Sequence, residues 1–129
     1  MKVGPEAART GKQGVVCRGV KRGGPHQTLD ITPGRYGAVA LVRVPTDSEA
    51  KATMTVSMTP LDEQGNNLPS LSTTVTAAAC GWTRIATAGD IPAVIGKRRV
   101  KKVRLIVIVD GFGTKDEVHI DDVALFRVE

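Results

Sequence analysis

The strongest constraint on the fold of this chain is the alternation of apolar and polar residues at period two, which recurs from one end to the other. In the stretch ATMTVSMTP, for example, Met54, Val56 and Met58 would face one way while the intervening Thr and Ser residues face the other. Such alternation is typical of β-strands with one buried face, and no segment shows a convincing helical period. The chain is therefore predicted to be all-β.

The alternating segments are short, and they are separated by Gly, Pro, Asn and Asp residues, which favour turns. About eight strands are predicted, at residues 14–20, 26–32, 36–45, 52–60, 70–78, 82–91, 100–110 and 117–128. Strand 100–110 carries apolar residues on both faces, which predicts a central position in its sheet. No repeat, low-complexity tract or linker divides the chain, so we expect residues 1–129 to form one domain.

Length and composition exclude several classes of protein. A chain of 129 residues can bury a core without disulfides or metals as obligatory supports. No apolar run approaches the roughly 20 residues of a membrane span, and the N-terminal stretch has no apolar core of a secretory signal. The sequence contains no GxSxG, HExxH, P-loop or Gly-rich dinucleotide turn. We therefore expect neither a membrane partner nor catalysis.

The net charge of +5 is concentrated in the basic run GKRRVKKVR at 96–104. Three interpretations are open: a nuclear address, an electrostatic site for nucleic acid or acidic polysaccharide, and a solvated strand entry that protects a sheet edge. Much of the run belongs to a predicted strand, which argues against the first. Nucleic-acid binding would also need stacking aromatics, and the chain has one Trp, one Tyr and two Phe. We expect no nucleic-acid partner.

Five motifs follow one another in a distinctive order: TGK at 10–12, PGRY at 33–36, GWT at 81–83, VRLIVIVDG at 103–111 and IDDVAL at 120–125. Together they resemble carbohydrate-binding modules with a galactose-binding-like fold. The resemblance implies an antiparallel β-sandwich of jelly-roll type. One sheet would contain strands 14–20, 117–128, 36–45 and 82–91, and the second sheet the other four. The family's usual first strand, with an Asn-x-x-Phe-Glu segment, is missing.

The same resemblance implies a non-catalytic module that binds a polysaccharide or oligosaccharide and belongs to a longer secreted protein, at an extracellular or cell-surface location. Its glycan would lie on the outward face of the second sheet, and the basic residues there favour an acidic glycan. The predicted ligand-binding residues are His26, Asp30, Thr53, Thr55, Lys102 and Arg104. None of them is aromatic, which favours the alternative of a structural or protein-interaction domain without a sugar site.

Asp121 and Asp122 are adjacent carboxylates inside a predicted strand. Neighbouring residues on a strand point to opposite faces, so they would not flank one scissile bond. In the family this segment helps to hold a structural calcium ion, which implies Asp121, Asp122 and Glu6 as candidate ligands. The other interpretation is a β-bulge whose acids make local hydrogen bonds. Both remain open at this point.

The jelly-roll order has further implications. Cys17 and Cys80 would lie on opposite sides of the sandwich, so both are predicted to be free thiols. Trp82 and Tyr36 are expected in or against the core, and Phe112 could be exposed near a rim. The missing first strand would leave an unpaired edge, through which the chain could form a homo-oligomer.

Overall fold

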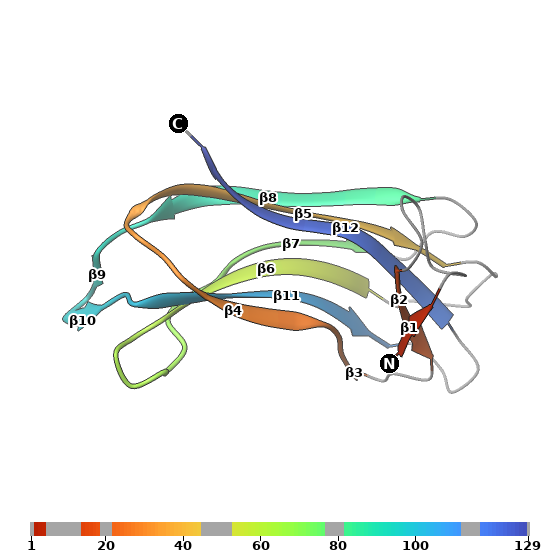
Figure 1. Cartoon of the computed structure of the whole chain (residues 1–129), viewed down its shortest axis with the longest axis horizontal. Helices are drawn as coiled ribbons and strands as arrows, with labels where there is room; N and C mark the ends of the chain where they lie inside the picture. Colours follow the sequence, from red (N-terminus) through yellow and green to blue (C-terminus); the bar gives the residue numbers. More distant parts are fainter. Residues whose placement is uncertain are drawn as a thin grey trace.

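The computed structural model describes residues 2–4, 14–18, 22–44, 53–76, 82–111 and 117–128. None of these residues forms a helix that could cross a membrane. They form strands that lie in two facing layers (Figure 1). The strands are β1 (Lys2–Gly4), β2 (Gly14–Arg18), β3 (Arg22–Gly23), β4 (His26–Asp30), β5 (Gly34–Arg43), β6 (Thr53–Leu61), β7 (Leu71–Thr76), β8 (Thr83–Ile91), β9 (Val94–Ile95), β10 (Arg98–Arg99), β11 (Lys102–Asp110) and β12 (Glu117–Val128).

The two layers are antiparallel sheets. The first sheet has the order β1-β2-β12-β5-β8. The second sheet has β11 near its centre, with β6 and then β7 on one side and with β3 and β4 on the other. The predicted all-β sandwich is confirmed, and so is the division of the eight predicted strands between its sheets.

The core fills the space between the sheets, and the period-two alternation supplies it. Met54, Val56 and Met58 are buried as the alternation predicted. On β11 the inward side chains are also buried, Val103 and Val107 among them. The opposite face of β11 is half-buried because strands pair with it on both sides, and this confirms its predicted central position.

Two predictions about single residues are also confirmed. Tyr36 is buried, and its hydroxyl donates a hydrogen bond of 2.7 Å to the carbonyl oxygen of Thr32. Such a bond from a tyrosine to the backbone a few residues upstream fixes a corner of a β-sandwich. Cys17 is a buried free thiol, and burial raises its pKa. Cys80 lies outside the described residues.

The structure also contains strands that the alternation did not predict. A short strand, β1, pairs with β2, so the edge expected to lie open beside residues 14–20 carries a partner. The strands β9 and β10 form a small hairpin around Gly96, whose φ is 62°. This hairpin contains part of the basic run. A strand of two residues is too short to show an alternation of apolar and polar residues.

Gly24 lies between β3 and β4, where the chain passes close to the backbone of β11. A Cβ atom on Gly24 would lie 1.8 Å from the carbonyl oxygen of Val107, which is a backbone atom and cannot swing away. The next residue, Pro25, accepts a hydrogen bond of 3.1 Å from the Val107 N–H. The absence of a side chain at Gly24 is therefore required for β4 to dock on β11.

We predict that Gly24→Ala lowers the free energy of unfolding by about 1–3 kcal/mol, the usual range for overpacking, because the backbone must move. Gly34→Ala is the matched control. Its Cβ would meet the guanidinium of Arg127 at 3.0 Å, and that flexible end can shift. Urea unfolding of both variants measures the difference. Equal destabilisation by the two substitutions would contradict this explanation.

Candidate functional site

The outward face of the second sheet is rich in hydroxyl groups. Thr55 on β6 lies opposite Thr74 on β7, and Ser57 lies opposite Ser72. The Oγ1 atoms of Thr55 and Thr74 are 2.7 Å apart. The hydroxyl oxygens of Thr59 and Ser70 are also 2.7 Å apart. These side chains form a polar strip across two neighbouring strands.

This face is hollowed along the strip. The depression has a volume of about 400 Å³. Its floor includes Ser57, which is only 4% exposed, while Ile108 supplies an apolar wall. The residues that line it are Arg22, Thr53, Thr55, Ser57, Ser70, Ser72, Thr74, Ile108 and Asp110.

An arginine lies at each end of the hydroxyl strip. At one end Arg22 forms an ion pair with Asp110, the residue opposite Thr53. At the other end Arg104 lies opposite Thr59, and its Nη1 donates a hydrogen bond of 3.2 Å to Asn67 Oδ1. Thr53 and Thr59 are six residues apart on one strand, which corresponds to about 20 Å. Both guanidiniums keep further N–H donors for a ligand.

The structure brings together only part of the predicted ligand-binding set. Thr53 and Thr55 line the depression, while Arg104 lies opposite Thr59 at the end of the strip and is not among the residues that line the depression. Lys102 and Asp30 instead approach each other, with a Lys102 Nζ to Asp30 Oδ1 distance of 3.6 Å.

His26 lies on β4 opposite Ile106, and it lines a different pocket with Pro25 and Gln27. Among the described residues, the sequence did not indicate Arg22, Ser70, Ser72, Thr74 or Asp110. The alternation within LSTTVT was the available signal for Ser72 and Thr74. Nothing in the sequence showed that β7 lies beside β6 in the register that completes the strip.

A buried carboxylate orders the loop that borders the site. Asp62 Oδ1 accepts hydrogen bonds from the backbone N–H groups of Asn66 at 2.8 Å and Gln64 at 3.0 Å. Its Oδ2 lies 3.5 Å from the guanidinium of Arg98. The bond from Asn66 contributes most to holding the pKa of Asp62 below its ordinary value. The loop continues to Asn67, the partner of Arg104.

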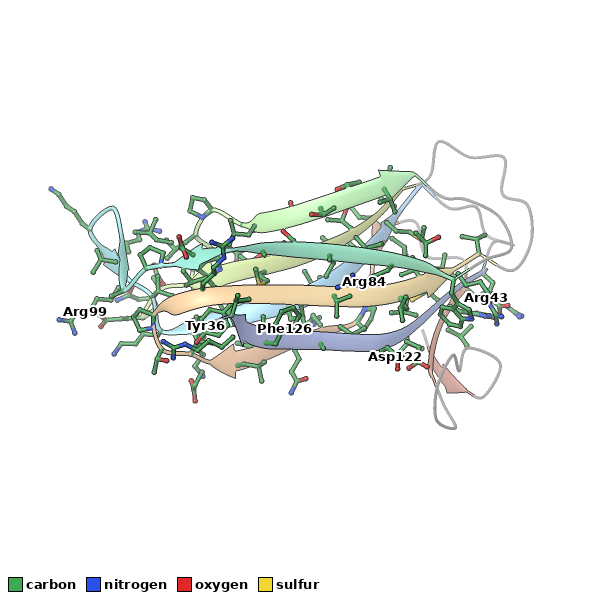
Figure 2. All side chains as sticks on the ribbon, turned by 90° about the horizontal axis from the view of Figure 1, so that it is seen from above. Tyr36, Arg43, Arg84, Arg99, Asp122 and Phe126 are labelled. Carbon is green, nitrogen blue, oxygen red and sulfur yellow. The ribbon has the colours of Figure 1, made fainter. Side chains whose placement is uncertain are left out.

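The adjacent acids of β12 form a β-bulge, as one of the two open interpretations predicted. The pairing of β12 with β5 shifts register between Asp121 and Ala124. Asp122 has a φ of 49°, and its N–H donates to Asp121 Oδ1 at 2.8 Å. Figure 2 shows Asp122 where β12 bends.

A bound calcium ion needs six to eight oxygen ligands. Within the described residues, no group of three His, Cys, Asp or Glu side chains gathers that could hold a metal. The predicted third ligand, Glu6, lies outside the described residues. Calcium binding at Asp121 and Asp122 therefore stays a prediction.

The aromatic side chains of the described residues lie away from the hydroxyl strip. Phe126 is 44% exposed on the outward face of the first sheet (Figure 2). Its ring covers Gly37, where a Cβ would lie 2.6 Å from ring atoms. Trp82 is half-buried, and its ring centroid lies 4.8 Å from the guanidinium carbon of Arg43. Phe112 lies outside the described residues.

Comparison with solved structures shows which proteins share this architecture. A family 16 carbohydrate-binding module matches with a TM-score of 0.69 at 18% identity, over 97% of this chain and 84% of its own. The CBM22-1 xylan-binding domain of Paenibacillus barcinonensis Xyn10C matches with a TM-score of 0.72 at 15% identity, over 98% and 80%. The fold is that of a carbohydrate-binding module.

A third carbohydrate-binding module extends the comparison. TmCBM61, solved in complex with β-1,4-galactotriose, matches with a TM-score of 0.58 at 20% identity, over 96% of this chain and 77% of its own. No family model and no curated protein matches the sequence. At these identities the likeness establishes the sandwich fold.

We predict that Asp62 makes the stability of the protein depend on pH. Because its folded pKa lies below the ordinary value of 3.8, its contribution is present above that value and is lost as the pH falls through the folded pKa. In Asp62→Asn, the decline in stability between about pH 5 and pH 2 should therefore be shallower. Urea unfolding across this range, with Glu63→Gln as the exposed neighbouring control, measures it. An unchanged pH profile in Asp62→Asn would refute the prediction.

Proposed function

We propose that this domain is a non-catalytic glycan-binding module whose ligand is an acidic polysaccharide. The observation that carries the proposal is the hydroxyl strip and its depression on the outward face of the second sheet, with Arg22 and Arg104 at the two ends of the strip. The domain would serve as an ancillary part of a longer secreted protein that acts on polysaccharides.

The chemistry of the depression suits a sugar chain. Serine and threonine hydroxyls both donate and accept hydrogen bonds, as do the hydroxyls of a glycan. Ile108 offers an apolar contact for the C–H face of a sugar ring. An arginine can bind a carboxylate or a sulfate with two parallel N–H donors, so two arginines about 20 Å apart fit an extended chain with repeated negative charge.

The comparisons support a sugar ligand in general terms. One similar structure is named for binding xylan, and another was solved with a galactotriose. The preference for an acidic ligand comes from this chain, because its net charge is +5 and an arginine lies at each end of the hydroxyl strip, with Arg22 at the Thr53 end and Arg104 opposite Thr59.

The lining of the depression also supports a non-catalytic role. Glycoside hydrolysis usually needs two carboxyl groups on opposite sides of the scissile bond, about 5–10 Å apart. Among the described residues that line the depression, Asp110 is the one acid, and it forms an ion pair with Arg22.

A protein-interaction domain is the alternative, and one observation favours it. No aromatic side chain lies among the described residues that line the depression, whereas sugar sites commonly use aromatic faces for stacking. Under this alternative the module would bind no glycan, and the hydroxyl strip would be a solvated surface.

We predict that acidic polysaccharides bind this domain and that Arg104→Ala and Arg22→Ala each weaken the affinity by about tenfold or more, the effect expected for a hydrogen bond between charged groups. Affinity electrophoresis against uronate-containing, sulfated and neutral polysaccharides, at low and high salt, measures this. Arg84→Ala, on the outward face of the first sheet (Figure 2), is the matched control. Thr55→Val tests the hydroxyl strip without changing the charge.

The outcomes distinguish the two candidate functions. The glycan site is supported if Arg22→Ala and Arg104→Ala each weaken binding while Arg84→Ala does not. Binding that is lost in Phe126→Ala instead would place the site on the other sheet. If no polysaccharide binds, or if binding is weak and salt removes it equally from all variants, the protein-interaction domain is the supported function.

A further inference from the structure

One side of the sandwich is open because β12 changes neighbours along its length. Residues 117–120 of β12 pair with β2 on one side and, from His119 onward, with β5 on the other. Beyond the bulge, residues 124–128 pair with β5 alone among the described strands, and Val123 belongs to the bulge itself. Within the described part of the chain, the second half of β12 is therefore a sheet edge with unpaired backbone groups.

The same side of the second sheet is also an edge. Among the described strands β4 pairs with β11 alone, and it lies on the same side of the sandwich as β12 but in the other layer (Figures 1 and 2). Two pockets lie between the edges. The larger, of about 430 Å³, joins Leu29 and Asp30 to Leu125 and Phe126. The smaller, of about 200 Å³, joins His26 to Val123.

The opposite side of the sandwich is closed. There β7 and β8 approach each other, and Leu71 covers Gly89 so closely that a Cβ on the glycine would lie 2.8 Å from Leu71 Cδ1. Among the described residues, no side chain closes the open side in this way, and the apolar side chains there are partly exposed. Val123 is 40% exposed, and Leu125 and Leu29 are half-buried.

Residues 123–128, VALFRV, carry little protection against strand pairing. Exposed edges usually contain lysine, acidic residues, proline or a bulge. This edge has one charged residue, Arg127, and its guanidinium donates to Thr32 Oγ1 and to the Pro33 carbonyl oxygen, both at 3.1 Å. The bulge precedes the edge and leaves the following residues regularly paired with β5.

We propose that the open side binds a second copy of this chain about a two-fold axis, with the second half of β12 pairing antiparallel to its counterpart. A two-fold axis perpendicular to the sheets makes such an edge self-complementary. We place Thr28 about level with Leu125, because His26 and Val123 line one pocket and Leu29 and Leu125 line the other. One axis near these two residues therefore brings both β12 and β4 against their counterparts.

The register about this axis gives favourable neighbours. On β4, His26 lies opposite the partner's Asp30, whose carboxylate is 89% exposed and available to a second cation. On β12, Phe126 lies beside the partner's Ala124, so a large side chain meets a small one. Val123 lies opposite the partner's Arg127. The two open grooves become a shared interior, which removes partly exposed apolar surface from water.

The test exploits the position of Val123, because each dimer contains two contacts between Val123 and Arg127. Val123→Lys places like charges opposite each other twice, and we expect it to raise the dimer dissociation constant by about tenfold or more. Val123→Glu places opposite charges there and should change that constant by less than about threefold. Val94→Lys is the control, since Val94 is 47% exposed on the β9–β10 hairpin. Sedimentation velocity over a wide concentration range measures the association.

Disulfide trapping tests the axis directly. In a chain with Cys80→Ser, so that buried Cys17 is the remaining native cysteine, Thr28→Cys should form a covalent dimer under mild oxidation. Thr74→Cys, equally outward on β7, should not. Thermal unfolding confirms that each variant is folded. A protein that is monomeric at all concentrations, or a dimer that Val123→Lys leaves unchanged, would overturn the proposal.

Discussion

The bulge at Asp121 and Asp122 is the constraint on which much of this architecture depends. Before it, β12 is an inner strand between β2 and β5, and after it β12 is an edge. An extra residue inside a strand bends it and increases its twist. The extra residue also changes which residues of β12 point into the core. Before the bulge the even-numbered Ile120 lies opposite the buried Val42, and after it the odd-numbered Leu125 lies opposite the buried Ala38. The two acids thus divide one long strand into two structural roles.

Sequence alone was sufficient for features that repeat locally. The alternation around Met54, Val56 and Met58 predicted the core face of β6. The resemblance to carbohydrate-binding modules implied which strands share a sheet. The hydroxyl strip could not be predicted as a unit. Its pairs, such as Thr55 with Thr74, depend on the register between strands that the sequence does not state. Arg22 was missed for a similar reason, since it belongs to a two-residue strand.

The residues of the basic run at 96–104 lie in different parts of the structure, and its last residue, Arg104, lies opposite Thr59 at the end of the hydroxyl strip. Arg98 and Arg99 lie on the β9–β10 hairpin at one end of the sandwich, and Arg98 contributes to the ordering of the loop at Asp62 (Figures 1 and 2). They do not line the depression. The case for an acidic ligand therefore depends on Arg22 and Arg104, which are far apart in the sequence and meet the same strip of β6.

The two proposals reinforce each other through symmetry. A two-fold axis perpendicular to the sheets joins the two copies of the second sheet side by side, so both hydroxyl-lined depressions would face the same direction. A depression with no aromatic side chain among its described lining residues would bind each sugar segment weakly. Two such sites on one face, however, can engage one long polysaccharide or neighbouring chains, and the second contact then occurs at a high effective concentration. Dimerisation through β12 would thereby compensate for the weak stacking of a single module.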